Sequence, residues 1–452
     1  MDLFDTPFYI LGATSRDNKR RIYELAEEKS LFYDFDLITK AQADLVNPRK
    51  RITAELAWLP GVGPRLAAEL IDSVENNKFA GQNQLDKLTP LARVNYLLSL
   101  LKHRQFDDYA DWTSLGFEVL VIAQFFERID IQEMAELLNA ERIAAGFPEI
   151  NDKLLIEESL HERRSYIRQI IKESLNRMPS KDLLEIMKFF VEESTDFGKQ
   201  HGLMIIDDLV AGYEIEVQDF LETEGNNINS LVSNIRSSLA RGSANQLIEK
   251  LISQLIAVVE NWQLVAEPIQ MNAKSRGGEH EKSVEIAKSI RSLGIDMYNE
   301  YGKIDYSTQL LETIKTFFSE VVTIAECVND DMEVINAISE RTMLREAEFA
   351  REITYETSVG IIFKERLKIS PAGIEWRNAT WNLEEITRIR WGGIKRSING
   401  IPTGTTYSAY FGSETNFVVI DLGNHQYEKF VDCLWKAVGV NILTDFLKGL
   451  KT

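Results

Sequence analysis

The sequence offers few of the residues that usually carry catalysis or hold metals. Its five histidines stand far apart, none with a second histidine at metal-ligand spacing: His103, His161, His201, His280 and His425. Two cysteines, Cys327 and Cys433, are too few for a disulfide framework or a four-thiolate zinc site. There is no Gly-x-Ser-x-Gly elbow and no cysteine–histidine signature. We therefore expect no enzyme activity, no metal and no cofactor.

One stretch has the residue types of a phosphate site. In LPGVGPR, residues 59–65, Gly61 and Gly63 would let the backbone approach a phosphate, and Arg65 would supply charge, as in a helix-hairpin-helix motif. Pro64 suits the first position of the second helix. Acidic surroundings and the lack of a second copy favour the alternative, a tight structural turn between two helices. Both interpretations stay open.

A second group of cations lies near the C-terminus. Arg388 and Arg390 would share one face of an alternating strand. The following segment, residues 391–407, is expected to be a long glycine-rich loop that carries an aromatic residue and two cations: Trp391, Lys395 and Arg396. Loops of that length are often functional. We expect either a solvated hairpin or a loop that binds a protein, an anion or an anionic membrane surface.

Composition limits the class of partner. The chain has 452 residues and a formal charge of −19. That charge argues against a protein whose main role is to coat nucleic acid, but it permits a local basic site. Hydrophobic residues at 44% and charged residues at 27% are typical of soluble globular domains, here two to four. No segment has the pattern of a signal peptide or a membrane span, so we expect a cytoplasmic protein.

The N-terminal segment predicts two short amphipathic helices. Apolar residues three and four apart predict one helix over residues 18–32 and another over 36–46, joined by SLFYDFD, residues 30–36. The first helix has three cations near its start: Lys19, Arg20 and Arg21.

This order resembles a J-domain over roughly the first 58 residues. ILG, a basic helix and a helix that ends in ADLVNPRKR carry the resemblance. J-domains activate seventy-kilodalton heat-shock ATPases through a His-Pro-Asp loop, and here only Asp34 or Asp36 matches any part of that loop. The resemblance therefore implies docking through Lys19, Arg20, Arg21 and Asp34 without the standard stimulation. The alternative is a solvated helix face.

Residues from about 85 to 348 follow a helical period. Helices are expected over 90–102, 114–129, 131–145, 153–176, 181–193 and 203–222, with breaks at 146–148, 178–180, 198–202 and 224–227. Residues 284–322 resemble one tetratricopeptide-type helical pair. Residues 268–281, with Lys274 and Arg276, are expected to be a loop, either plain or anion-binding.

The period changes from 3.6 to 2 at about Tyr355. Alternating runs are separated by turn signals at residues 371–373, 392–393, 399–400 and 423–424. A final amphipathic helix would turn apolar residues inward: Tyr427, Phe430, Val431, Leu434 and Trp435. Strands followed by one helix resemble a pleckstrin-homology fold, a β-barrel capped by a helix.

We therefore expect a mainly α protein in three parts. These are a J-like head (residues 1–80), a helical, partly tetratricopeptide-like middle (81–350) and a pleckstrin-homology-like barrel (355–452). The whole order resembles a group of bacterial J-domain-like proteins. The leading hypothesis is a non-catalytic, co-chaperone-like adaptor or scaffold that binds a chaperone-type ATPase or another protein partner. The alternative is a nucleic-acid-linked regulator that binds the phosphate backbone through residues 59–65.

Overall fold

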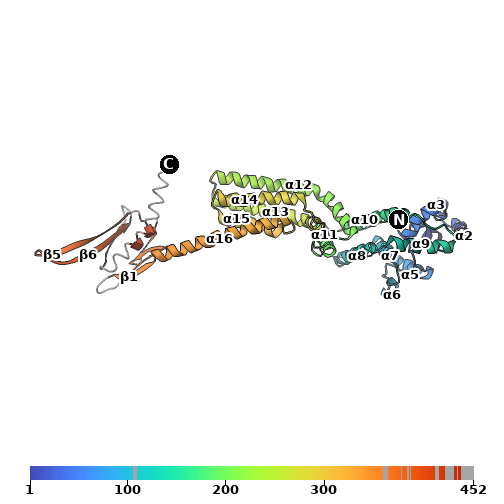
Figure 1. Cartoon of the computed structure of the whole chain (residues 1–452), viewed down its shortest axis with the longest axis horizontal. Coiled ribbons are helices and arrows are strands. Elements are labelled where there is room, and N and C mark those ends of the chain that lie inside the picture. The colour runs from blue at the N-terminus through green and yellow to red at the C-terminus, as the bar shows by residue number, and fades with distance from the viewer. Residues whose placement is uncertain are drawn as a thin grey trace. The chain divides into compact units, whose positions relative to one another are not determined.

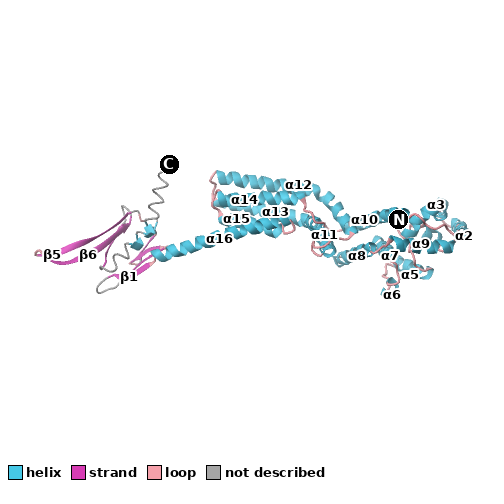
Figure 2. Cartoon of the chain, in the orientation of Figure 1, coloured by secondary structure: helices cyan, strands magenta, loops and turns pink. Residues whose placement is uncertain are grey.

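The structure is a computed structural model that describes residues 1–104, 109–359, 365–377, 379–383, 386, 388–412, 417–422, 432–434 and 436–438. The chain divides into two units, Met1–Met332 and Glu333–Thr452. Helices build the first unit, and the strands belong to the second (Figure 2). The predicted mainly α fold and the change of period at Tyr355, where the first strand begins, are confirmed. No helix in the described part is long and apolar enough to cross a bilayer.

The head begins with four short helices. They are α1 (Pro7–Leu11), α2 (Lys19–Ser30), α3 (Phe35–Val46) and α4 (Pro48–Ala57). Each starts where a side chain accepts a hydrogen bond from the first helical turn, at Thr6, Asn18, Asp34 and Asn47. The apolar stripes of α2 and α3 pack on α1, and the same core contains Ala145 and Phe147 from much later in the chain. The two predicted helices are thus confirmed to within two residues.

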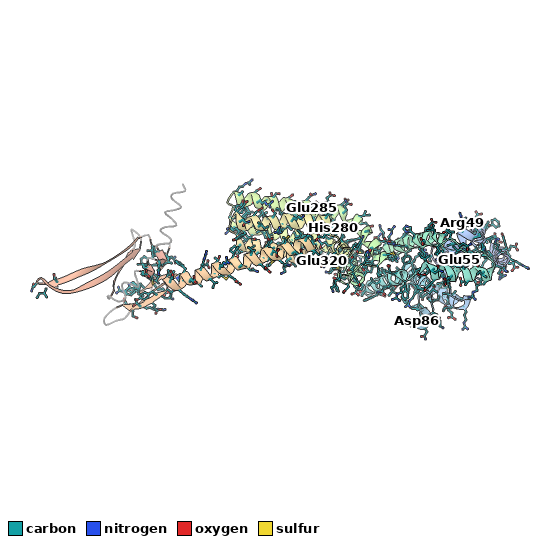
Figure 3. All side chains as sticks on the ribbon, in the orientation of Figure 1. Arg49, Glu55, Asp86, His280, Glu285 and Glu320 are labelled. Carbon is teal, nitrogen blue, oxygen red and sulfur yellow. The ribbon has the colours of Figure 1, made fainter. Side chains whose placement is uncertain are left out.

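A buried ion-pair cluster joins α4 to the helix that precedes Phe147. Arg51 Nε donates to Glu55 Oε1 at 2.7 Å, and Arg142 Nε donates to Glu55 Oε2 at 2.8 Å. Arg51 also donates to the Ser15 carbonyl and lies 3.9 Å from the Phe147 ring centre. All three charged side chains are buried. Figure 3 labels Glu55 at this position. Both guanidinium groups bond to the one Glu55 carboxylate, so this carboxylate connects α4 to the helix that contains Arg142 and is the partner on which two buried charges depend.

The next helices largely follow the predicted pattern. They are α5 (Pro64–Glu75), α6 (Gln82–Leu85), α7 (Pro90–His103), α8 (Tyr109–Glu127), α9 (Ile131–Ala145), α10 (Leu154–Leu175) and α11 (Ser180–Thr195). The predicted break at residue 146 is a left-handed cap, Gly146, with φ of 71°. Breaks at 178–180 and 198–202 also separate helices. The separation of a head at residue 80 stays a prediction.

Four helices complete the first unit. They are α12 (Met204–Ala240), α13 (Asn245–Ser275), α14 (Glu281–Asn299) and α15 (Ile304–Phe317), which lie side by side in Figure 1. The next helix, α16 (Val322–Ile353), begins in the first unit and ends in the second. Helices α14 and α15 confirm a helical pair within residues 284–322, and its tetratricopeptide type stays a prediction.

Two predictions in this region are wrong. No break occurs at residues 224–227, because Gly225 is buried within α12 and faces Ile286 of α14, where its small size serves helix packing. Residues 268–281 are not one loop, since α13 continues through Pro268 to Ser275. The two cations lie near carboxylates: Lys274 Nζ is 3.0 Å from Glu320, and Arg276 Nε is 3.9 Å from Asp207.

A buried polar network fixes the start of α14. Gln270 Nε2 donates to Gln263 Oε1 at 2.9 Å and to Ser283 Oγ at 3.0 Å. The Ser283 hydroxyl lies 2.6 Å from His280 Nδ1, and the imidazole stacks on Trp262. Figure 3 labels His280 in this position. Burial, with the nearby charge of Lys282, lowers the pKa of His280 to about 4. The imidazole is therefore neutral near pH 7.

This lowered pKa predicts a pH dependence of stability. Between an unfolded pKa of 6.5 and a folded pKa of about 4, the unfolded chain binds more protons at His280. Stability from this group is thus fully present above about pH 6.5 and is lost as the pH falls to about 4. We expect a loss on the order of 3 kcal/mol, measured by urea unfolding at several pH values. In His280→Phe the free energy of unfolding should no longer fall by this amount between pH 6.5 and pH 4. An unchanged dependence on pH would contradict the assignment to His280.

The second unit contains two antiparallel sheets. The first has the order β1 (Tyr355–Val359), β2 (Glu365–Ser370), β3 (Gly373–Trp376) and β4 (Ala379–Trp381). The second has the order β5 (Arg388–Ile398), β6 (Ile401–Gly412) and β7 (Phe417–Leu422). Apolar side chains of β2 and β3 form a core with Ile353, Leu434 and Val438. The inward position predicted for Leu434 is confirmed, and Tyr427, Phe430, Val431 and Trp435 lie outside the described residues.

The long loop predicted over residues 391–407 is wrong, whereas the alternative, a long hairpin, agrees with the structure. Those residues continue β5 and β6, which pair antiparallel from Arg388↔Gly412 to Ile398↔Ile401. The connection is a two-residue turn, Asn399 and Gly400, with φ of 53° and 78°. Positive φ at both positions is the geometry of the tight hairpin turn that Asn-Gly favours. The turn expected at residues 392–393 is also wrong, since both glycines pair within β5.

Candidate functional site

The turn between α2 and α3 presents five apolar side chains to solvent. We call Leu31, Phe32, Tyr33, Phe35 and Leu37 the apolar tip. Phe32 is 81% exposed and Phe35 is 69% exposed. Scattered exposed apolar residues are normal, but a contiguous group in seven residues marks an interaction site.

The charges next to the tip are mostly compensated or structural. Arg20 forms an ion pair with Glu24, and Arg21 with both Glu24 and Glu28. Lys19 Nζ lies over the Phe147 ring at 5.6 Å. Asp34 caps α3 by accepting from Leu37 N at 2.9 Å. The four residues predicted to contact a partner are thus on one helix and its turn, but α2 offers little net positive charge.

The predicted hairpin exists, and it is pinned to neighbouring helices. Thr89 Oγ1 donates to the Pro60 carbonyl at 2.8 Å, and Asn95 Nδ2 donates to the Leu56 and Trp58 carbonyls. Gly61 has φ of 78°, and a Cβ there would lie 2.9 Å from Thr89 Cγ2. Gly61 is therefore required by the turn and by its packing on α7, independently of any phosphate.

One face of the hairpin lies next to an internal carboxyl. Burial raises the pKa of Glu141 of α9, and the Gly61 backbone nearby acts in the opposite direction by favouring the charged form. On the other side, Gly63 precedes α5 with no side-chain cap, and Arg65 is 94% exposed but lies 3.2 Å from Glu69. Only the Gly63 and Arg65 side of the hairpin is open to a ligand.

The C-terminal cations lie on one strand. The backbones of Arg388, Arg390, Trp391, Lys395 and Arg396 all belong to β5, with a shift of register between Arg396 and Ser397. Their side chains are outside the described part of the structure. The sequence prediction of binding through these residues stays a prediction.

The described residues contain no group of three His, Cys, Asp or Glu side chains that could hold a metal ion. A groove of about 860 Å³ lies between α10, α11 and α12. Two ion pairs join α10 to α12 there: Arg164 with Asp208 at 2.6 Å, and Lys172 with Glu216. These pairs connect α10 to α12, and His161 is a lining residue of the same groove.

Sequence reasoning missed the apolar tip. It treated SLFYDFD only as a place where a histidine and a proline are absent. A usable signal was present, because four apolar residues in a connection of seven cannot all face the core of a two-helix hairpin. Comparison of the chain with protein-family models, with curated proteins and with solved structures gave no match.

Proposed function

We propose that this protein is a non-catalytic adaptor whose J-like head docks on a chaperone-type ATPase through the apolar tip. The observation that carries the proposal is the exposure of Phe32 and Phe35 in the connection that corresponds to the J-domain loop. An apolar surface of this kind gains free energy when a partner covers it, about 1.5–3 kcal/mol for each large side chain. The tip is thus the anchor, and the paired cations of α2 contribute less.

The charges next to the apolar tip indicate which kind of surface on the ATPase can bind it. Within the part of the chain that the structure describes, Asp34 and Asp36 form no ion pair, whereas the neighbouring arginines do. Lys29 Nζ lies 5.1 Å from the centre of the Tyr33 ring, so two carboxylates accompany one ammonium group and the net charge at the tip is acidic. The matching surface on the ATPase is an apolar groove with a basic rim. Since most of the gain is apolar, binding should depend only weakly on salt.

The two other parts of the chain support a scaffold. The helical middle provides grooves for a protein client. The pleckstrin-homology-like assignment of the second unit is supported by sheets of four and three strands and by the packing of Leu434 and Val438 on the first sheet. This part is proposed to anchor the assembly.

The test is direct binding of the full chain to the seventy-kilodalton ATPase of the source organism. Phe32→Ser combined with Phe35→Ser should weaken binding by at least about 30-fold, because two exposed anchors are removed. Phe220→Ser, an exposed phenylalanine of α12, is the matched control and should bind like the wild type. Isothermal titration at about 50 and 300 mM salt should give affinities within roughly threefold.

Two results would contradict the proposal. One is no binding of the wild type to the ATPase. The other is equal binding by the double variant and the Phe220→Ser control. ATP turnover is expected to stay at its basal rate, since the head has no His-Pro-Asp loop.

The second candidate function is binding of a nucleic-acid backbone through the hairpin. It is favoured by the uncapped first turn of α5 and by the exposure of Arg65. It predicts binding to a duplex of about 20 base pairs that falls steeply with salt. Arg65→Glu should abolish that binding, and Glu69→Gln, which frees Arg65 from its ion pair, should strengthen it. Binding that ignores both substitutions excludes this hairpin.

A further inference from the structure

A pocket beside the buried polar network has the groups of a ligand site. It has a volume of about 570 Å³ and lies between α12, the end of α13 and the start of α14. Its lining combines apolar side chains, which include Val210, Leu221, Ile269 and Ala273, with polar and charged ones. Among the polar groups, the imidazole of His280 and the carboxylate of Glu214 lie 3.8 Å apart. Apolar surface next to converging polar groups is the usual form of a ligand pocket.

The network determines which nitrogen of His280 carries the hydrogen. Gln270 uses its two amide hydrogens on Gln263 and Ser283. The single hydroxyl hydrogen of Ser283 is then free to go to His280 Nδ1, which accepts it at 2.6 Å. The neutral ring therefore has its hydrogen on Nε2. Ser283 is itself fully buried, so this pair does not form an exposed nucleophile.

His280 thus presents a fixed donor to the pocket. Its side chain is only 9% exposed, and Nε2 lies 3.8 Å from Glu214 Oε1, which is beyond hydrogen-bond distance. Stacking on Trp262 and the bond to Ser283 hold the ring in place. A donor and an acceptor side by side, both turned to the same space, are complementary to an amide, which has a carbonyl oxygen next to an N–H group.

Charge in the pocket also favours an uncharged ligand. Arg276 and Lys282 line the pocket together with three carboxylates, those of Glu214, Glu279 and Glu281, and the Glu279 carboxylate accepts from Thr323. A free anion would meet these carboxylates, and a free cation would meet the two basic side chains. We propose that this pocket binds an amide group on an apolar body, with His280 Nε2 donating to the carbonyl and Glu214 accepting from the N–H.

The carbonyl and the N–H belong either to the primary amide of a small molecule or to one residue of an extended peptide segment, whose N–H and C=O point to the same side. Isovaleramide is the first probe, and isovalerate, with the same apolar body and a carboxylate, is its matched counterpart. We expect isovaleramide to shift the His280 imidazole resonances saturably, with a dissociation constant on the order of millimolar for so small a ligand. Isovalerate should bind at least about fivefold more weakly, because Glu214 repels it.

Variants of the full chain test the two polar groups separately. Glu214→Ala, at a partly exposed position on α12, and His280→Phe, which keeps the stacking, should each weaken isovaleramide binding by about fivefold. Glu222→Ala, two turns further along α12 and outside the pocket, should leave it unchanged. An acetylated four-residue peptide amide that binds at least about tenfold more tightly identifies a peptide ligand, and equal affinity identifies a small amide.

The proposal is overturned by any of three results. These are no saturable shift with isovaleramide, binding of isovalerate as tight as that of the amide, and amide binding that Glu214→Ala leaves unchanged. Because Glu214 is partly exposed, the last test does not depend on the folding of the His280→Phe variant.

Discussion

Glu55→Gln should lower the free energy of unfolding of the first unit by about 3–5 kcal/mol. The substitution keeps the shape of the side chain but removes the single carboxylate that Arg51 and Arg142 share. Two buried guanidinium groups would then face a neutral amide, and a buried charge without a partner is strongly destabilising. The measurement is the urea midpoint of the helical circular dichroism signal.

A second substitution separates the lost ion pair from a general disturbance of the core. In Glu55→Gln combined with Arg142→Met, one of the two unpaired charges is gone, so part of the stability should return. Glu69→Gln is the matched control, because its partner Arg65 is exposed, and its effect should stay within about 0.5 kcal/mol. Equal midpoints for Glu55→Gln and Glu69→Gln would show that the cluster does not stabilise the head.

Gly373→Ala should disrupt the first sheet of the second unit. Gly373 has φ of 128°, a conformation open to glycine, and a Cβ there would lie 2.2 Å from the Trp381 carbonyl oxygen. Backbone strain and the clash with the next strand together should cost about 2–5 kcal/mol. Peptides that cover residues 365–381 should lose their protection from hydrogen exchange, which is measured by mass spectrometry.

The control for this prediction is Gly400→Ala. Gly400 also has positive φ, 78°, but a Cβ there would meet no atom within 4 Å. That substitution carries the backbone strain alone, on the order of 1–2 kcal/mol. If Gly373→Ala raises hydrogen exchange no more than Gly400→Ala does, β3 and β4 have room for a Cβ at residue 373, which contradicts the prediction. Exchange in residues 1–332 should be unchanged in both variants.

Local signals in the sequence predicted several helix boundaries correctly. The helices expected over 90–102, 131–145 and 153–176 agree with α7, α9 and α10 to within one residue, and the break at 146 is Gly146 in the left-handed conformation. The Asn399-Gly400 turn was recognised as well. These features depend on a few adjacent residues, so the sequence contains all the information that they need.

Features that depend on distant contacts were not predicted. Gly225 and Gly392 were interpreted as breaks. Gly225 instead lies within α12 and packs against α14, and Gly392 lies within β5 and pairs with β6. The head core needs Phe147, and the His280 network needs Gln270 from α13, and neither pairing has a signal in the sequence alone. The apolar tip was missed for the opposite reason: the residues were visible, but only the fold shows that no core covers them.

The shared core of the head has a consequence for inheritance. Ala145 and Phe147 complete the packing around α1–α3, and Arg142 completes the ion pairs of α4. A recombination event that exchanged only the first 80 residues would separate these side chains from the surfaces that they were selected to cover. The head and residues up to about 150 should therefore vary together among descendants of this gene.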